Sequence, residues 1–236
     1  MTTIAVYSLK GGVGKTTLAA NLAWCAATRS SRRTLLWDLD PQAAASWILG
    51  REGKRDRAQA AFSREVDAHR LIRPTGTARL DLLPADASLR DLDHQLREMD
   101  KKKRLSKLIA GLGDYDCVIL DCPPGLTETA EQVARAADLI VIPVLPSPLA
   151  QRAYHEVERH LGGRTATLPV HAMVDRRRRM HLDMIAARSE WPVIPMASVV
   201  ETASAAHRAV GEAAPRSAAA AAFLDIWQRI ERRLAF

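Results

Sequence analysis

The segment Lys10-Gly11-Gly12-Val13-Gly14-Lys15-Thr16-Thr17 follows the short apolar run Ile4 to Tyr7 and precedes a helix-forming stretch. Glycines at such positions let successive backbone N–H groups turn toward the oxygens of an anion without a Cβ clash. The positive end of the following helix points at the same anion. A strand, a glycine-rich turn and a helix in this order predict a phosphate-binding loop. We therefore expect the chain to bind a nucleotide.

Two side chains of this loop have separate predicted roles. Lys15 is expected to neutralise charge on the β- and γ-phosphates, and the Thr16 hydroxyl to ligate Mg²⁺. Compared with the usual pattern G-x-x-x-x-G-K-[ST], Leu9 stands where the first glycine belongs, and a second lysine, Lys10, follows it. This second lysine is the more distinctive feature of the loop.

Composition limits the class of protein and of partner. The chain has 236 residues, of which 47% are hydrophobic, and no linker divides it, so we expect a single domain over residues 1–236. A net charge of +7 favours a polyanionic partner, either nucleic acid or an anionic membrane surface. The sequence shows no secretory signal, and its longest apolar stretch, residues 139–150, is interrupted by prolines. We expect a cytoplasmic protein whose three cysteines are buried free thiols.

Short apolar runs alternate with longer helical patterns along the chain, which indicates βαβ units. The predicted class is α/β, with a doubly wound, mostly parallel sheet flanked by helices. The expected strands are residues 4–8, 34–37, 80–83, 117–120, 139–144, 170–174 and 193–194. The expected helices are residues 15–28, 89–112, 127–137, 150–161, 180–189, 201–210 and 217–234.

Three further segments have ambiguous patterns. Residues 50–78 are polar and arginine-rich, which is consistent with a helix and surface loops. The basic run 101–104 lies inside a helical pattern, where we expect a solvated face rather than a binding patch. The last helix has an apolar stripe with arginines beside it, and packing against the sheet is favoured over binding to lipid.

Acidic residues end two of the predicted strands. Asp121 follows the apolar run from Cys117 to Leu120, the position of the carboxylate on the magnesium side of a phosphate-loop nucleotidase. We assign Asp121 to Mg²⁺ through a water molecule, because Mg²⁺ retains several waters. Residues 122–125 then form a stiff turn that could sense the γ-phosphate.

The other acidic motif ends the strand at residues 34–37. Asp38 and Asp40 are two residues apart, so both can reach the same side of the chain end. Asp40 is the candidate for orienting or deprotonating the attacking water, and Asp38 for supporting Mg²⁺ and the loop lysine through hydrogen bonds. Asp40 could also serve as a helix N-cap before Pro41.

With these motifs, the chain resembles the ParA/MinD family of deviant-Walker ATPases, whose loop reads K-G-G-x-G-K-[ST]-T and whose next motif reads D-x-D-P-Q. The resemblance extends to the D-C-P-P turn at residues 121–124 and to the C-terminal helix. It implies hydrolysis of ATP to ADP and phosphate, weak without a partner. It also implies a homodimer with ATP at its interface, in which Lys10 of one subunit reaches the phosphates bound by the other.

The surface controlled by ATP differs between the two branches of this family. In ParA-like members the dimer binds DNA without sequence preference, and the resemblance makes Arg216 a candidate contact, with Arg176 and Arg177 from a second basic block. A further arginine that the family often has after Ile194-Pro195 is absent, because Met196 stands there. The resemblance implies a nucleoid-associated partitioning ATPase that acts on plasmid, chromosome or protein cargo and is stimulated by a ParB-like or adaptor protein. The alternative is a MinD-like regulator that cycles on membranes.

Overall fold

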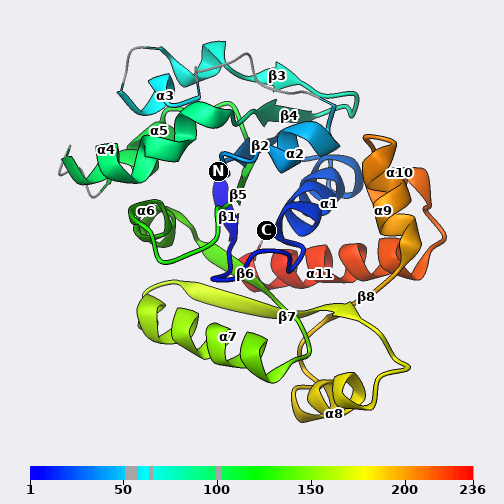
Figure 1. Ribbon diagram of the computed structural model, residues 1–236. Helices are drawn as coiled ribbons and strands as arrows, with labels where there is room; N and C mark the ends of the chain where they lie inside the picture. The colour runs from blue at the N-terminus through cyan, green and yellow to red at the C-terminus, as the bar shows by residue number, and fades with distance from the viewer. Residues whose placement is uncertain (51–57, 64–65, 99–102, 236) are drawn as a thin grey trace.

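Eight strands form one sheet in the computed structural model, in the order β3-β4-β2-β5-β1-β6-β7-β8 (Figure 1). The structure describes residues 1–50, 58–63, 66–98 and 103–235. All neighbouring strands pair in parallel except β3, which runs antiparallel to β4. The predicted class, a mostly parallel α/β sheet, is confirmed. The strands are β1 (Thr2–Val6), β2 (Thr34–Asp38), β3 (Arg73–Pro74), β4 (Leu80–Leu83), β5 (Cys117–Asp121), β6 (Leu139–Val144), β7 (Ala166–Val174) and β8 (Val193–Pro195).

Helices cover both faces of the sheet. The helical segments are α1 (Lys15–Arg29), α2 (Ala44–Ile48), α3 (Ala60–Ser63), η1 (Ala68–Arg70), η2 (Ala87–Asp91), α4 (Leu92–Glu98), α5 (Arg104–Ala110), α6 (Glu128–Ala136), α7 (Pro148–Leu161), α8 (Arg179–Ala187), α9 (Ser198–Ala205), α10 (Val210–Ala213) and α11 (Ala218–Leu234). Helices α1, α10 and α11 pack on one face, and α4 to α7 on the other (Figure 1). This arrangement explains why the central strands are apolar throughout, since every residue of β2, β5 and β6 is buried.

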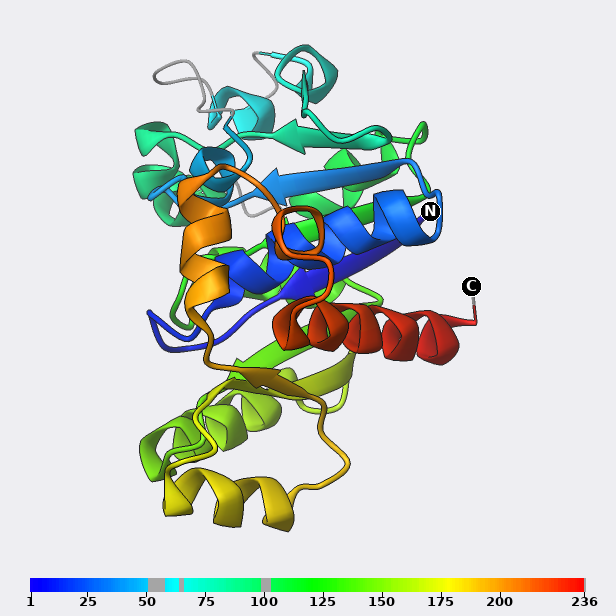
Figure 2. The same ribbon diagram turned by 90° about the vertical axis from the view of Figure 1, so that its right-hand side faces the viewer.

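The C-terminal helix packs against the body of the protein. Figure 2 shows α11 lying alongside α1, and its apolar stripe of Phe223, Trp227 and Ile230 is at most 2% exposed. The indole N–H of Trp227 donates a hydrogen bond to the Ser30 hydroxyl at 2.8 Å. The expected packing of this stripe on the sheet is confirmed. Among the described residues, no helix combines the length and the apolar character needed to cross a bilayer.

Two predicted helices are interrupted. The helix expected over residues 89–112 is divided into η2, α4 and α5, with residues 99–102 outside the described chain. The helix expected over residues 201–210 begins earlier, at Ser198, and ends at Ala205, because His207 takes a left-handed conformation with φ of 53°. A second short helix then begins at Val210. The described helices are therefore shorter than the local pattern predicts at both places.

The basic run at residues 101–104 does not form a uniformly solvated face. Lys101 and Lys102 lie outside the described residues, and Lys103 is exposed. Arg104, in contrast, is 2% exposed, and its guanidinium donates to the carbonyl oxygens of Phe62 at 2.7 Å and Ala61 at 3.4 Å. The prediction was wrong for Arg104 because its acceptors come from a segment some forty residues away.

The segment 50–78 contains less helix than expected. Its described parts form α3, η1 and the edge strand β3, while residues 51–57 and 64–65 lie outside the described chain. The three cysteines, Cys25, Cys117 and Cys122, are buried and free, as predicted.

Candidate nucleotide-binding site

The glycine-rich loop connects β1 to α1 at the carboxyl edge of the sheet. Gly12 and Gly14 have φ values of 72° and 87°, a left-handed backbone that favours glycine. Helix α1 begins at Lys15 with no side chain capping its N-terminus. Its first N–H groups therefore point, without an internal partner, at the space above the loop, where an anion would satisfy them.

Lys15 is buried at the base of this loop. The side chain is 7% exposed, and its ammonium group donates to the Lys10 carbonyl oxygen at 3.1 Å. Burial lowers the pKa of Lys15, while the nearby carboxylates of Asp121 and Asp40 raise it. One N–H of the ammonium group is used by Lys10, so the others are available to phosphate oxygens.

A cavity of about 710 Å³, which we call the polar cavity, opens beside the loop. It is bounded by the loop and the start of α1, by the chain after β2, by η2 and α4, and by the turn after β5. Its lining residues are Gly11, Gly12, Gly14, Lys15, Thr16, Thr17, Leu39, Asp40, Pro41, Gln42, Leu89, Arg90, Asp93, Pro123, Pro124, Thr127, Thr129 and Met173. Most of the predicted loop residues and Asp40 are therefore brought together around one cavity.

Asp121 lies below this cavity, at the end of β5. The residue is fully buried, and neither of its carboxylate oxygens has a hydrogen-bond partner that meets normal geometry among the described residues. Burial and the neighbouring Asp38 raise the pKa of Asp121 well above its usual value, while Thr16 and Lys15 lower it. A buried carboxylate without partners is costly unless a cation or a proton balances it. The pair Thr16 and Asp121 consequently fits a magnesium ion, which prefers oxygen ligands.

Asp38 has a different environment from the one expected. Its Oδ2 atom accepts hydrogen bonds from the Ser46 backbone N–H at 2.9 Å and hydroxyl at 2.8 Å. Its Oδ1 atom accepts from the backbone N–H of Asp40 at 3.1 Å. Burial raises the pKa of Asp38 to about 6 despite these hydrogen bonds. Within the described chain, the hydrogen bonds of Asp38 thus fix α2 and Asp40 rather than reaching Lys15.

Asp40 lines the polar cavity but does not cap a helix. Its Oδ1 atom accepts from the Gln42 N–H at 2.9 Å, which closes a turn at residues 40–43. Helix α2 starts only at Ala44, after Ala43 in a left-handed conformation with φ of 53°. The helix N-cap interpretation was wrong, because the chain turns once more before it becomes helical.

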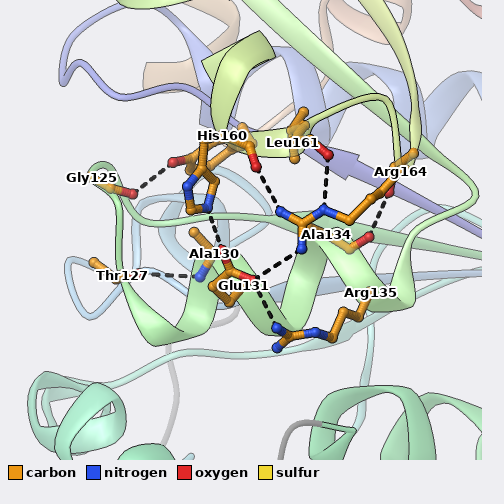
Figure 3. A network of polar contacts seen from close by, with 11 residues as sticks. Gly125, Thr127, Ala130, Glu131, Ala134, Arg135, His160, Leu161 and Arg164 are labelled. Atoms are coloured by element: carbon orange, nitrogen blue, oxygen red, sulfur yellow. Dashed lines mark hydrogen bonds and ion pairs between the residues drawn. The ribbon is translucent and has the colours of Figure 1, made fainter. Parts of the chain in front are cut away.

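The turn after β5 is anchored at both ends. The Tyr7 hydroxyl donates to the Gly125 carbonyl oxygen at 2.8 Å, and the Thr127 hydroxyl caps α6 by accepting from the Ala130 N–H at 3.2 Å. Figure 3 shows how Glu131 of α6 then contacts three side chains, which are His160 at 2.7 Å and Arg164 at 3.6 Å near the end of α7, and Arg135 at 3.0 Å on α6. These contacts hold α6 against α7. The turn at residues 122–126 is therefore held by Tyr7 on one side and by the fixed start of α6 on the other.

A second cavity of about 370 Å³, which we call the apolar cavity, adjoins the polar cavity at Gly14, Thr17 and Met173. Pro195, Met196 and Val200 form part of its far side. Met173 has a φ of 52°, at a point where the pairing of β7 with β8 is irregular. Sequence motifs gave no signal for these residues, nor for Arg90 of the polar cavity, because tertiary packing assembles them from separate segments.

The remaining predicted residues lie outside the polar cavity. Lys10 lines a small hollow with Val13 and residues of β6 and α7. Arg216 is exposed before α11, and Arg176 and Arg177 are exposed after β7. Arg177 is already paired with Asp175 at 2.9 Å, and this pairing lowers the pKa of Asp175 to about 2.

Comparisons with known proteins agree with this geometry. A family model described as an AAA domain matches residues 1–161. The sporulation initiation inhibitor protein Soj of Bacillus subtilis is 36% identical over 146 residues, which cover 60% of this chain and 57% of Soj. A ParA family protein of Chlamydia pneumoniae is 31% identical over 175 residues, covering 72% of this chain and 69% of that protein. The chain spans about half the length of several curated relatives that it matches.

A solved structure shows the same fold over the whole chain. The septum site-determining protein MinD of Pyrococcus horikoshii, complexed with Mg-ADP, aligns with a TM-score of 0.83 and 23% identity over 99% of this chain and 97% of MinD. The family model covers more than half of the sequence. The chain therefore belongs to this AAA domain family and to the ParA family.

Proposed function

We propose that this protein is a partitioning or positioning ATPase whose ATP-bound homodimer binds DNA without sequence preference. Hydrolysis, stimulated by a ParB-like or adaptor protein, releases the dimer from the nucleoid and so moves a plasmid, chromosome or protein cargo. A relative from Myxococcus xanthus is named chromosome partitioning protein ParA, and the Chlamydia relative is named a ParA family protein, which supports this choice.

The observation that carries the proposal is the fully buried Asp121 carboxylate, which lies next to Thr16 and Lys15 of the glycine loop. When Asp121 is ionised, a cation is needed to balance its buried charge. Mg²⁺ held by Thr16 and Asp121 would offset charge on the phosphates when it is bound.

Other residues of the site would bind the phosphates, orient the attacking water and accept the base. The loop N–H groups from Gly11 to Thr17 bind phosphate oxygens, and Lys15 neutralises them. Asp40 lines the same cavity and orients the attacking water. The apolar cavity adjoins the loop and accepts the base.

We expect Lys10 to act on the nucleotide of a second subunit. Its side chain lines a hollow outside the polar cavity, and its backbone carbonyl already accepts from Lys15. A cation supplied across a twofold axis stabilises transition-state charge and makes assembly depend on ATP. We therefore expect Lys10→Ala to retain ATP binding and lose ATP-dependent dimerisation in light scattering. Normal dimers in this variant would contradict the role of Lys10.

The DNA-binding proposal is tested by sedimentation of the protein with random-sequence DNA and with anionic liposomes, each with and without a nonhydrolysable ATP analogue. We expect ATP-dependent binding to DNA that weakens with salt, since phosphate contacts release counterions. Arg216→Ala and Arg176→Ala should weaken this binding, whereas Arg177→Ala should weaken it less, because Asp175 already pairs with Arg177. Binding to liposomes alone would favour the MinD-like alternative.

A further inference from the structure

The positions of the two cavities indicate how a bound nucleotide would lie across the strands of the sheet. The apolar cavity lies at the ends of β7 and β8, and the glycine loop follows β1. On the other side of β1 the sheet continues through β5 and β2 to β4. A nucleotide with its base in the apolar cavity and its phosphates at the loop therefore extends its terminal phosphate toward β5, β2 and β4.

Arg90 stands at the far end of this line. It belongs to η2, which follows β4, and it lines the polar cavity together with Lys15. The neighbouring Leu89 is 4% exposed and anchors η2 in the core. Asp86 caps η2 by accepting from the Ser88 N–H at 2.9 Å. Leu89 and Asp86 thus fix the backbone that bears Arg90. This backbone lies on the side of the cavity toward which the terminal phosphate of the nucleotide would extend.

In the described parts of the chain, no hydrogen bond or ion pair joins the guanidinium of Arg90 to another residue. Asp93, one turn further, accepts from the Thr129 N–H at 2.9 Å and hydroxyl at 2.6 Å, so its Oδ1 atom is occupied by α6. Asp40, the other carboxylate lining this cavity, accepts from the Gln42 N–H at 2.9 Å. The cavity therefore contains two cationic side chains, Lys15 at its base and Arg90 at its outer end.

We propose that Arg90 is a further phosphate-binding residue, which contacts the terminal phosphate from the side opposite the glycine loop. This inference rests on the proposed function of the site as an ATP site. A guanidinium group can donate two parallel hydrogen bonds to a phosphoryl group, and a diphosphate lacks the group that it would reach. Arg90 thereby distinguishes ATP from ADP within one protomer.

The test compares nucleotide affinities by calorimetric titration in Mg²⁺, at protein concentrations where light scattering reports single protomers. Arg90→Ala should weaken a nonhydrolysable ATP analogue about tenfold and leave ADP within about twofold, because a charge-assisted hydrogen bond is lost only with the triphosphate. Arg90→Lys, which keeps the charge but not the paired donors, should lie between the two. Arg97→Ala, an exposed arginine of α4 that does not line the cavity, serves as the matched control.

The possible outcomes separate this inference from the proposed function. Equal losses for ADP and the ATP analogue, no loss for either, or a loss seen only in dimers would each overturn the role of Arg90. If the wild-type protein itself bound no magnesium nucleotide, the proposed function would fail first. If the wild-type protein bound both nucleotides and Arg90→Ala behaved as wild type, only the inference about Arg90 would fail.

Discussion

The polar and apolar cavities meet at Gly14, Thr17 and Met173, yet they are built in different ways. The polar cavity relies on backbone N–H groups and charges, and its central part comes from one continuous segment after β1. The apolar cavity relies on side chains of β7, β8 and α9, which lie far from the loop in sequence. The first kind of site depends on a local motif, while the second depends on how distant segments pack.

This difference predicts separate energetic roles. Charge-assisted contacts at the polar cavity should supply most of the binding free energy and the discrimination between phosphates. The apolar cavity should contribute less binding free energy, and the same amount for ATP and ADP, since both carry the same base. Four measurements test this division.

The largest effect is expected at Lys15. Lys15→Ala should reduce ATP affinity roughly 100-fold, because hydrogen bonds to charged groups contribute about 1.5–3 kcal/mol each. Calorimetric titration measures the loss, and Lys107→Ala, an exposed lysine of α5 that lines neither cavity, is the control. The thermal stability of the nucleotide-free variant should not fall, since burial of Lys15 already disfavours its charged form. ATP affinity close to wild type would remove the electrostatic basis of the polar cavity.

The second effect concerns the buried carboxylates Asp38 and Asp121, which lie side by side at the ends of β2 and β5. Burial raises the pKa of both, to about 6 for Asp38, so the folded protein retains protons that the unfolded chain has released. Their contribution to the free energy of unfolding without Mg²⁺ is therefore present below pH of about 4 and is lost as the pH rises to about 6 and above. For Asp38 alone the change should be about 3 kcal/mol.

Urea denaturation of wild type and Asp121→Asn across this range isolates the carboxylate pair from other titrating groups. Asn cannot ionise, so the variant should be more stable than wild type at neutral pH without Mg²⁺, and the gap should shrink on acidification. Added Mg²⁺ with ATP should stabilise the wild type and not the variant. A gap independent of pH would show that Asp121 is not the source of the effect.

The contrast between the cavities also explains what could be predicted from sequence. The strands around the loop are recognisable because burial on both faces makes them apolar, and β5 ends at Asp121 as expected. Gly14 and Lys15 could be assigned because their roles follow from local backbone chemistry. Arg90, in contrast, belongs to no motif, and only the parallel order of β1, β5, β2 and β4 brings it to the same edge.

Packing between distant segments also limited what could be predicted from sequence for Arg104 and Asp38. Arg104 is buried because carbonyl oxygens of Ala61 and Phe62 accept its hydrogen bonds. These acceptors are distant in sequence, so the charge of Arg104 alone predicted a solvent-exposed side chain. The hydrogen bonds of Asp38 to Ser46 depend on how α2 folds back after the turn at residues 40–43. In these cases the residue types were informative, but their partners could not be inferred from spacing.

A third, smaller effect is expected at Gly14, where the two cavities meet. Its φ of 87° is unfavourable for any residue with a Cβ, and a Cβ there would lie 3.4 Å from Met173 Cε. Gly14→Ala should cost roughly 1–2 kcal/mol of stability and weaken ADP and ATP alike. Gly76→Ala, where a Cβ meets no atom within 4 Å, is the matched control for denaturation and titration. A stable Gly14→Ala variant with normal affinity would mean that the loop tolerates another backbone conformation.

The smallest effect is expected at Met173, on the apolar side. Met173→Ala removes side-chain atoms beside the base and should weaken ATP and ADP by the same factor, about threefold or ~0.7 kcal/mol. Inorganic tripolyphosphate, which has no base, should bind the variant and the wild type equally. Met180→Ala, a methionine that is 52% exposed and lines neither cavity, controls for general effects of the substitution. If tripolyphosphate binding fell as much as ATP binding, Met173 would act through Gly14 and the loop, and the two cavities would form one energetic unit.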